Sequence, residues 1–181
     1  SNDELITDET ITHLAEASEA PIEIDHPFID DMSKYPELKT REMPTGNTEL
    51  EEIGKTIAKN NRVADLMGHA GVGKDTILKV IFAATNRPYV GINMDKSMIS
   101  QELMGSYKID EDGKVYFKDG VVPHCGKYGF NLIISEINAA HADIISALHQ
   151  VTEKNGKIHV KQKDEVIEPS PKFRIVTTRN P

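Results

Sequence analysis

A glycine-rich segment that ends in a lysine carries the first residues that could do chemistry. Gly68, Gly73 and Lys74 reproduce the spacing G-x-x-x-x-G-K. Glycines let a backbone curl so that its N–H groups point inward at an anion, and the lysine reaches the same anion. A glycine-rich turn before an ordinary helix is the alternative. The spacing predicts a phosphate-binding loop formed by Gly68, His69, Ala70, Gly71, Val72, Gly73, Lys74, Asp75 and Thr76.

Two residues near this loop differ from the usual metal-binding pattern. The residue after the lysine is normally Ser or Thr, whose hydroxyl binds Mg²⁺, and here it is Asp75, followed by Thr76. Three alternatives follow. The Asp75 carboxylate binds the metal, the Thr76 hydroxyl binds it after a small shift of the backbone, or the site binds metal weakly. Further along, an apolar strand that normally continues into Asp-Glu continues into Ser135 and Glu136. The sequence therefore predicts metal ligands among Asp75, Thr76 and Ser135. An exchange of carboxylate and hydroxyl between the two positions would conserve the charge near the metal, and a site that binds nucleotide but hydrolyses it slowly is the alternative.

Polar residues at the ends of two apolar runs complete a predicted catalytic site. Glu136 follows one run and is placed to orient or deprotonate a water molecule. Asn180 follows another and could hydrogen-bond that water or a γ-phosphate. With Lys74 on the phosphates, these residues predict a nucleoside triphosphate as the ligand and Mg²⁺ as its metal. An ordinary surface carboxylate is the alternative for Glu136.

Apolar periodicity predicts the elements that position these residues. Strands are expected at Arg62–Met67, Tyr89–Met94, Phe130–Ile134 and Phe173–Thr178, the third of them central. Helices are expected from Asn47 or Thr48 to about Asn60, directly after the glycine loop, and over Ala142–Glu153; hairpins are expected at Tyr107–Phe117 and Lys157–Glu168. Strands that alternate with helices predict an α/β fold with a parallel sheet, whose ligands bind at the carboxyl ends of the strands.

Charge is distributed unevenly along the 181 residues. The formal net charge of −8 divides into −12 for residues 1–53 and +4 for residues 54–181. We expect an acidic N-terminal arm and linker over residues 1–46, with a short helix at Asp8–Ala20, and a nucleotide-binding core over residues 47–181. Cys125 is the only cysteine, which excludes an intrachain disulfide. No apolar run approaches the length of a membrane span, so we expect a soluble, cytoplasmic protein.

Five separated blocks of the sequence occur in a characteristic order. They read GHAGVGKDT, INMDKSMISQELMGSY, VYFKDGVVPHC, LIISEINAAHADIISALHQVTE and PKFRIVTTRNP. Together they resemble the MoxR group of AAA+ ATPases, within the P-loop NTPase fold, and are similar to the CobS-like ATPase subunit of aerobic cobaltochelatase. The resemblance covers Asn47–Pro181 and implies that Gly68–Asp75 is Walker A, Ile133–Glu136 is Walker B and Asn180 is sensor 1. The hairpins look like the helix-2 insert and the pre-sensor-1 hairpin.

This resemblance implies an ATPase core that hydrolyses ATP in a homo-oligomeric, hexameric ring to remodel or activate a protein partner. The family continues beyond sensor 1 into an arginine finger and a helical lid, so we expect the lid to be absent from this chain as a fragment or truncated product. A hydrolysis-poor nucleotide-binding adaptor and a small P-loop nucleotide kinase stay open. Nucleic acid is not favoured as a partner, because the total charge is acidic and no aromatic residues interleave with the lysines of Lys157–Lys163.

Overall fold

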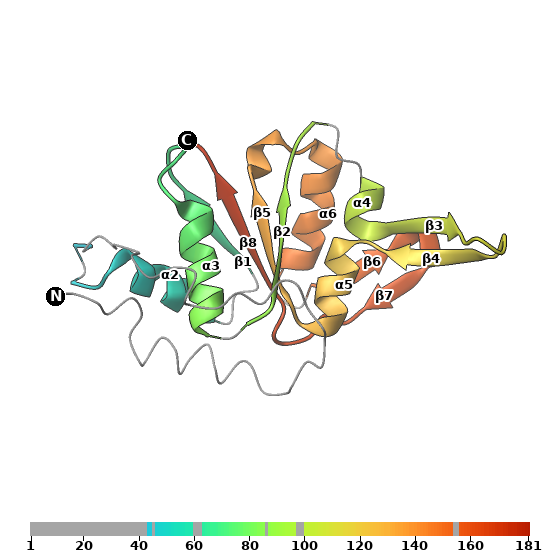
Figure 1. The fold of residues 1–181 in the computed structure, drawn as a ribbon, viewed down its shortest axis with the longest axis horizontal. Coiled ribbons are helices and arrows are strands. Elements are labelled where there is room, and N and C mark those ends of the chain that lie inside the picture. The colour runs from blue at the N-terminus through green and yellow to red at the C-terminus, as the bar shows by residue number, and fades with distance from the viewer. Residues whose placement is uncertain (1–42, 45, 60–62, 86, 97–99, 154–155) are drawn as a thin grey trace.

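A four-stranded parallel sheet lies at the centre of the computed structural model (Figure 1). Its strands are β1 (Val63–Met67), β2 (Tyr89–Asn93), β5 (Asn131–Ser135) and β8 (Arg174–Arg179), in the order β1-β8-β5-β2. The predicted α/β class and parallel sheet are confirmed, and β5 is an inner strand as expected. The structure describes residues 43–44, 46–59, 63–85, 87–96, 100–153 and 156–181, so the predicted helix at Asp8–Ala20 and nearly all of the predicted linker lie outside the described residues.

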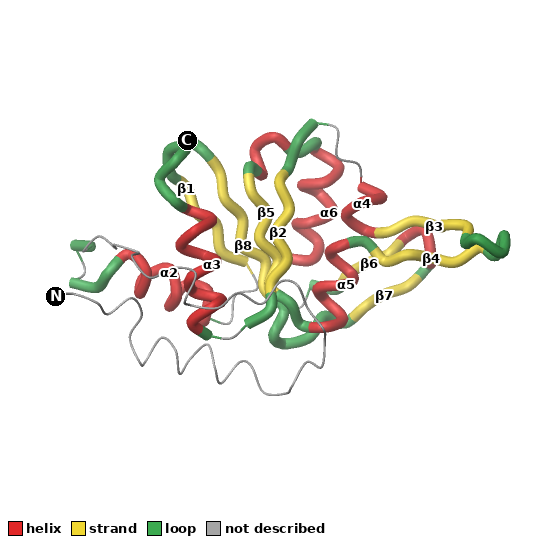
Figure 2. The backbone as a smooth tube through the Cα atoms, viewed as in Figure 1, coloured by secondary structure: helices red, strands yellow, loops and turns green. Residues whose placement is uncertain are grey.

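Helices cover both faces of this sheet (Figure 2). On one face lie α2 (Glu49–Ala58) and α3 (Lys74–Ala84), and on the other lie α4 (Ser100–Met104), α5 (Val121–Tyr128) and α6 (Ala142–Thr152). Along β5, Ile133 packs with the α3 side, whereas Leu132 and Ile134 pack with the α6 side. Because both faces are buried, β5 is apolar at successive positions. Within the described ranges, no helix is long and apolar enough to span a membrane.

A capping box starts α2. The Thr48 hydroxyl accepts a hydrogen bond from the Glu51 N–H at 3.2 Å, and the Glu51 carboxylate accepts one from the Thr48 N–H at 2.6 Å. This arrangement satisfies two backbone donors that a helix start leaves without partners inside the helix. Of the two predicted capping residues, Thr48 therefore caps the helix. Leu50 and Ile57 then bury the apolar side of α2 in the α3 side of the core.

Two antiparallel hairpins project from the side of the molecule that carries α4, α5 and α6 (Figure 1). In the first, β3 (Gly105–Ile109) pairs with β4 (Val115–Asp119), and in the second, β6 (Ile158–Val160) pairs with β7 (Glu165–Ile167). Both predicted hairpins are confirmed. Between β6 and β7, the 3-10 helix η3 (Lys161–Lys163) and Asp164 at φ 52° reverse the chain.

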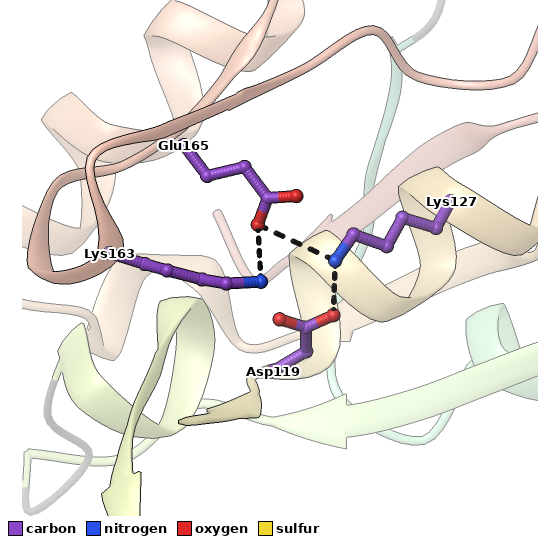
Figure 3. Close-up of polar contacts among 4 residues, drawn as sticks. All are labelled: Asp119, Lys127, Lys163 and Glu165. Carbon is purple, nitrogen blue, oxygen red and sulfur yellow. Dashed lines mark hydrogen bonds and ion pairs between the residues drawn. The ribbon is translucent and has the colours of Figure 1, made fainter. Parts of the chain in front are cut away.

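A row of four charged side chains connects the two hairpins through α5 (Figure 3). Lys127 Nζ lies 2.6 Å from Asp119 Oδ2 and 3.6 Å from Glu165 Oε2, and Lys163 Nζ lies 2.9 Å from the same Glu165 oxygen. The hydrogen bond to Asp119 raises the pKa of Lys127, and the hydrogen bond from Lys163 lowers the pKa of Glu165. Water reaches these groups and screens their attraction, so the row contributes little to the stability of the fold.

Cys125 of α5 provides an internal probe of folding. Its side chain is fully buried, and burial raises the pKa of the thiol to about 12. The thiolate is the reactive form, so at about pH 8 the folded protein should resist alkylation, whereas the unfolded chain should react. Reaction of Cys125 with iodoacetamide therefore reports the unfolded fraction.

We expect Thr48→Ala to reduce the free energy of unfolding by about 1 kcal/mol, because the capping hydroxyl is lost. Urea unfolding, followed by circular dichroism and by Cys125 alkylation, measures the change. Thr56→Ala is the matched control, since it makes the same substitution in α2 where the hydroxyl donates only to the Glu52 carbonyl on an exposed surface. That control should change stability by less than about 0.5 kcal/mol. Equal effects of the two substitutions would contradict the role of the cap.

Candidate functional site

The predicted phosphate-binding loop connects β1 to α3 at the carboxyl edge of the sheet. Gly71 and Gly73 have φ angles of 78° and 83°, a conformation that side-chain-bearing residues rarely adopt. The Gly68 N–H donates to the Arg179 carbonyl at 3.2 Å, which ties the start of the loop to the end of β8. The loop leads into α3 at Lys74, so the positive end of the helix dipole lies at the loop.

The three predicted catalytic residues form one hydrogen-bonded row. Lys74 Nζ lies 2.7 Å from the Gly68 carbonyl, 3.0 Å from the His69 carbonyl and 3.1 Å from Asn180 Oδ1. Asn180 Nδ2 in turn donates to both Glu136 carboxylate oxygens, at 3.1 and 2.9 Å. The amide of Asn180 thus connects the ammonium group to the carboxylate, although the residues come from distant parts of the chain.

Glu136 has an unusual backbone conformation. Its φ of 59° and ψ of 40° lie in the left-handed region, which is uncommon for residues other than Gly, Asn and Asp. The residue joins the end of β5 to the 3-10 helix η2 (Ile137–Ala139), and its carbonyl accepts from the Ala139 N–H at 2.8 Å. Such conformations cost on the order of 1–3 kcal/mol and cluster at functional sites. No pattern in the sequence predicted this one.

The two altered metal-site positions are in direct contact. Ser135 Oγ donates to Asp75 Oδ2 at 2.8 Å, and Thr178 Oγ1 donates to Asp75 Oδ1 at 3.3 Å. Carboxylate and hydroxyl oxygens are the hard donors that Mg²⁺ prefers. If the carboxylate and the hydroxyl have exchanged positions, Asp75 and Ser135 must lie close enough to bind the same metal ion. Their hydrogen bond meets this requirement.

A pocket of about 230 Å³ opens above these groups. Small or polar side chains surround it, which suits anionic phosphates and a hydrated cation better than an apolar ligand. It is lined by Ala70, Gly71, Gly73, Lys74, Asp75, Thr76, Glu136 and Thr178. The other predicted site residues do not line this pocket: the Gly68 and His69 carbonyls accept from Lys74, Ser135 and Asn180 contact Asp75 and Glu136, and Val72 is 57% exposed.

Thr178 is a site residue that the sequence analysis did not identify. It is 2% exposed and lies on β8 two residues before Asn180. Side chains two residues apart on a strand point to the same face of the sheet. Counting back two residues from Asn180 along the sequence would therefore have placed Thr178 on the same face as the predicted site. The same alternation places Ser135 on the face of β5 that carries Ile133 and packs towards α3.

A strand, a G-x-x-x-x-G-K loop and a helix, in a parallel sheet with polar groups at its carboxyl edge, define a P-loop nucleotide-binding protein. The family model for the AAA domain (dynein-related subfamily) matches residues 66–181, and the chain belongs to this family. Membership of the AAA family separates the chain from the small nucleotide kinases considered above.

Sequence similarity to two known proteins supports the same assignment. Midasin from Dictyostelium discoideum is 24% identical over 167 residues, which are 91% of this chain and 3% of midasin. The aerobic cobaltochelatase subunit CobS from Sinorhizobium sp. is 31% identical over 124 residues, which are 67% of this chain and 37% of CobS. The resemblance to MoxR-type AAA+ ATPases is thereby confirmed, and the chain spans well under half the length of either relative.

A solved structure supports the fold independently. The crystal structure of NtrX from Brucella abortus superposes with a TM-score of 0.55 at 18% identity, over 70% of this chain and 28% of that chain. At this identity the likeness concerns the fold alone.

We expect Lys74→Ala to weaken binding of a non-hydrolysable ATP analogue by at least about tenfold, because a charge-assisted contact to phosphate is lost. Isothermal titration calorimetry measures the affinity. Lys79→Ala is the control, since it removes the same charge from α3 at a position that does not line the pocket. An affinity of Lys74→Ala equal to that of the original protein would refute the phosphate-loop assignment.

Proposed function

We propose that this AAA domain of MoxR/CobS-like type binds ATP with Mg²⁺ and hydrolyses it. The observation that carries the proposal is the row Lys74–Asn180–Glu136 beside the pocket. It supports hydrolysis because a phosphate-binding cation and a potential water-activating carboxylate share one small polar pocket.

Each residue of the row has a role in the proposed reaction. Lys74 and the loop N–H groups would hold the β- and γ-phosphates, and Glu136 would orient the attacking water and accept its proton. Asn180 would hold the Glu136 carboxylate and donate to the water or to the γ-phosphate. In phosphoryl transfer the protein takes little part in the covalent chemistry. Catalysis comes from positioning the reactants and from electrostatic stabilisation of the transition state.

The oxygen atoms of the Asp75 and Ser135 side chains suit Mg²⁺ by their chemistry. Asp75 would provide the carboxylate and Ser135 the hydroxyl, with Thr76 as a further hydroxyl at the exposed side of the pocket. When bound, Mg²⁺ would neutralise negative charge on the phosphates.

We further propose that the domain acts in a hexameric ring in the cytoplasm, where it remodels or activates a protein partner. Membership of the AAA family and similarity to midasin and CobS support this proposal. A nucleotide-binding adaptor that hydrolyses ATP slowly is the second candidate. Asp75 and Ser135 favour it, because both differ from the residues that usually serve the metal.

We expect Glu136→Gln to reduce phosphate release from ATP by at least about a hundredfold, because glutamine keeps the shape of the side chain and cannot accept a proton. Affinity for ATP should stay within about twofold of the original. Glu153→Gln, the same change at the exposed end of α6, is the control. Unchanged turnover would exclude Glu136 as the water-activating group, and binding without turnover in the original protein would favour the adaptor.

The exchanged metal ligands predict an unusual dependence on Mg²⁺. Without the cation, the Asp75 carboxylate repels the phosphates, so ATP affinity should rise strongly when Mg²⁺ is added. Asp75→Thr should reduce this rise by at least about fivefold, since a charge pair at short range interacts by about 1 kcal/mol or more. Adding Ser135→Asp to that variant should restore the usual arrangement and its Mg²⁺ dependence. Titrations of ATP with excess Mg²⁺ and with EDTA measure the effect, and identical results for all three proteins would contradict the exchange.

A further inference from the structure

We infer that Thr178 is a positioning residue, which together with Ser135 fixes the orientation of the Asp75 carboxylate at the metal side of the pocket. The inference rests on the proposed function, because it concerns how Asp75 serves Mg²⁺ and nucleotide. It adds to that function a residue whose hydroxyl acts through another side chain.

The contacts of Asp75 carry the inference. Each carboxylate oxygen receives one hydroxyl donor, Oδ2 from Ser135 at 2.8 Å and Oδ1 from Thr178 at 3.3 Å. The final torsion of an aspartate side chain has a broad range, so one anchored oxygen leaves the carboxylate free to rotate. Two donors, one on each oxygen, remove that rotation.

The sheet makes the two donors rigid. Ser135 ends β5 and Thr178 lies on β8, and these neighbouring strands pair as far as Ile134 with Thr177. Thr178 is 2% exposed, and its β-branched side chain has restricted χ1 freedom. A buried hydroxyl needs a polar partner, and for Thr178 the structure provides the Asp75 carboxylate.

The need for such an arrangement follows from the residue at position 75. A Ser or Thr there would be short and neutral, whereas Asp75 is charged and lies next to Lys74 at the pocket. A carboxylate that rotates presents its oxygens to Mg²⁺ less consistently, so the cation would be held less tightly. Donors on the strand ends draw it towards the edge of the sheet, where it can face the metal.

The test compares two adjacent threonines of β8 in the full chain. Thr178→Val removes the donor and keeps the branched shape, while Thr178→Ser restores the hydroxyl. Thr177→Val is the matched control, because the Thr177 hydroxyl also donates to an aspartate, Asp65, at 2.8 Å, but that carboxylate does not line the nucleotide pocket. Calorimetry with a non-hydrolysable ATP analogue gives the ratio of affinities with excess Mg²⁺ and with EDTA.

We expect Thr178→Val to lower this ratio by about three- to tenfold, the effect of losing one hydrogen bond of typical strength. Thr178→Ser should stay within about twofold of the original, and Thr177→Val should leave the ratio unchanged. In an Asp75→Thr background, Thr178→Val should have no effect on the ratio, because the carboxylate that it positions is gone.

Each contrary outcome has a separate meaning. If Thr178→Val matches Thr177→Val while binding still depends on Lys74, the positioning role is refuted and the proposed function stands. If the effect of Thr178→Val persists without Asp75, Thr178 acts directly and the inference is also refuted. If the original protein shows no Mg²⁺-dependent binding, the proposed function fails and the inference with it. Resistance of Cys125 to alkylation confirms that each variant is folded; should Thr178→Val unfold, Thr178→Ala removes the same donor and must lower the ratio in the same way.

Discussion

Parallel hydrogen bonding of β8 to β1 on one side and to β5 on the other sets the geometry of the whole site. Met67 pairs with Arg179, and Ile134 pairs with Thr177, so the ends of the three strands lie at one edge of the sheet. The residues that follow are the glycine loop, Glu136 and Asn180. Asn180 can connect Lys74 to Glu136 only because β8 lies between the other two strands.

Two buried arginines hold the turn that leads into β8. Arg87 is 2% exposed and donates to the Lys172 carbonyl at 2.7 Å, and Arg174 donates to the Phe173 carbonyl at 2.9 Å. Burial, and next the charge of Arg174, lower the pKa of Arg87 to about 10. Both guanidinium groups therefore bind the turn that leads into β8. By binding that turn, they hold the start of β8 in place.

Burial of both sheet faces explains why polar chemistry is confined to the strand ends. Alternate residues of β5 and β8 fill the core on either side, as Ile133 and Val176 do towards α3 and Leu132 and Ile175 do towards α6. A polar side chain in the middle of these strands would be buried without water. At the carboxyl ends, the hydroxyls of Ser135 and Thr178 continue the α3 face and find the Asp75 carboxylate.

Local patterns in the sequence were sufficient to predict the loop, the strands, the hairpins and the gathering of Lys74, Glu136 and Asn180, because glycine spacing and apolar periodicity express short-range backbone preferences. The tertiary structure alone decided the strand order and, with it, the contacts of Asp75 with Ser135 and Thr178. It also decided the left-handed conformation of Glu136. The alternation of side chains along a strand shows which face of the sheet each one occupies. It does not show which strand lies beside it, because strand order depends on packing between segments far apart in the chain.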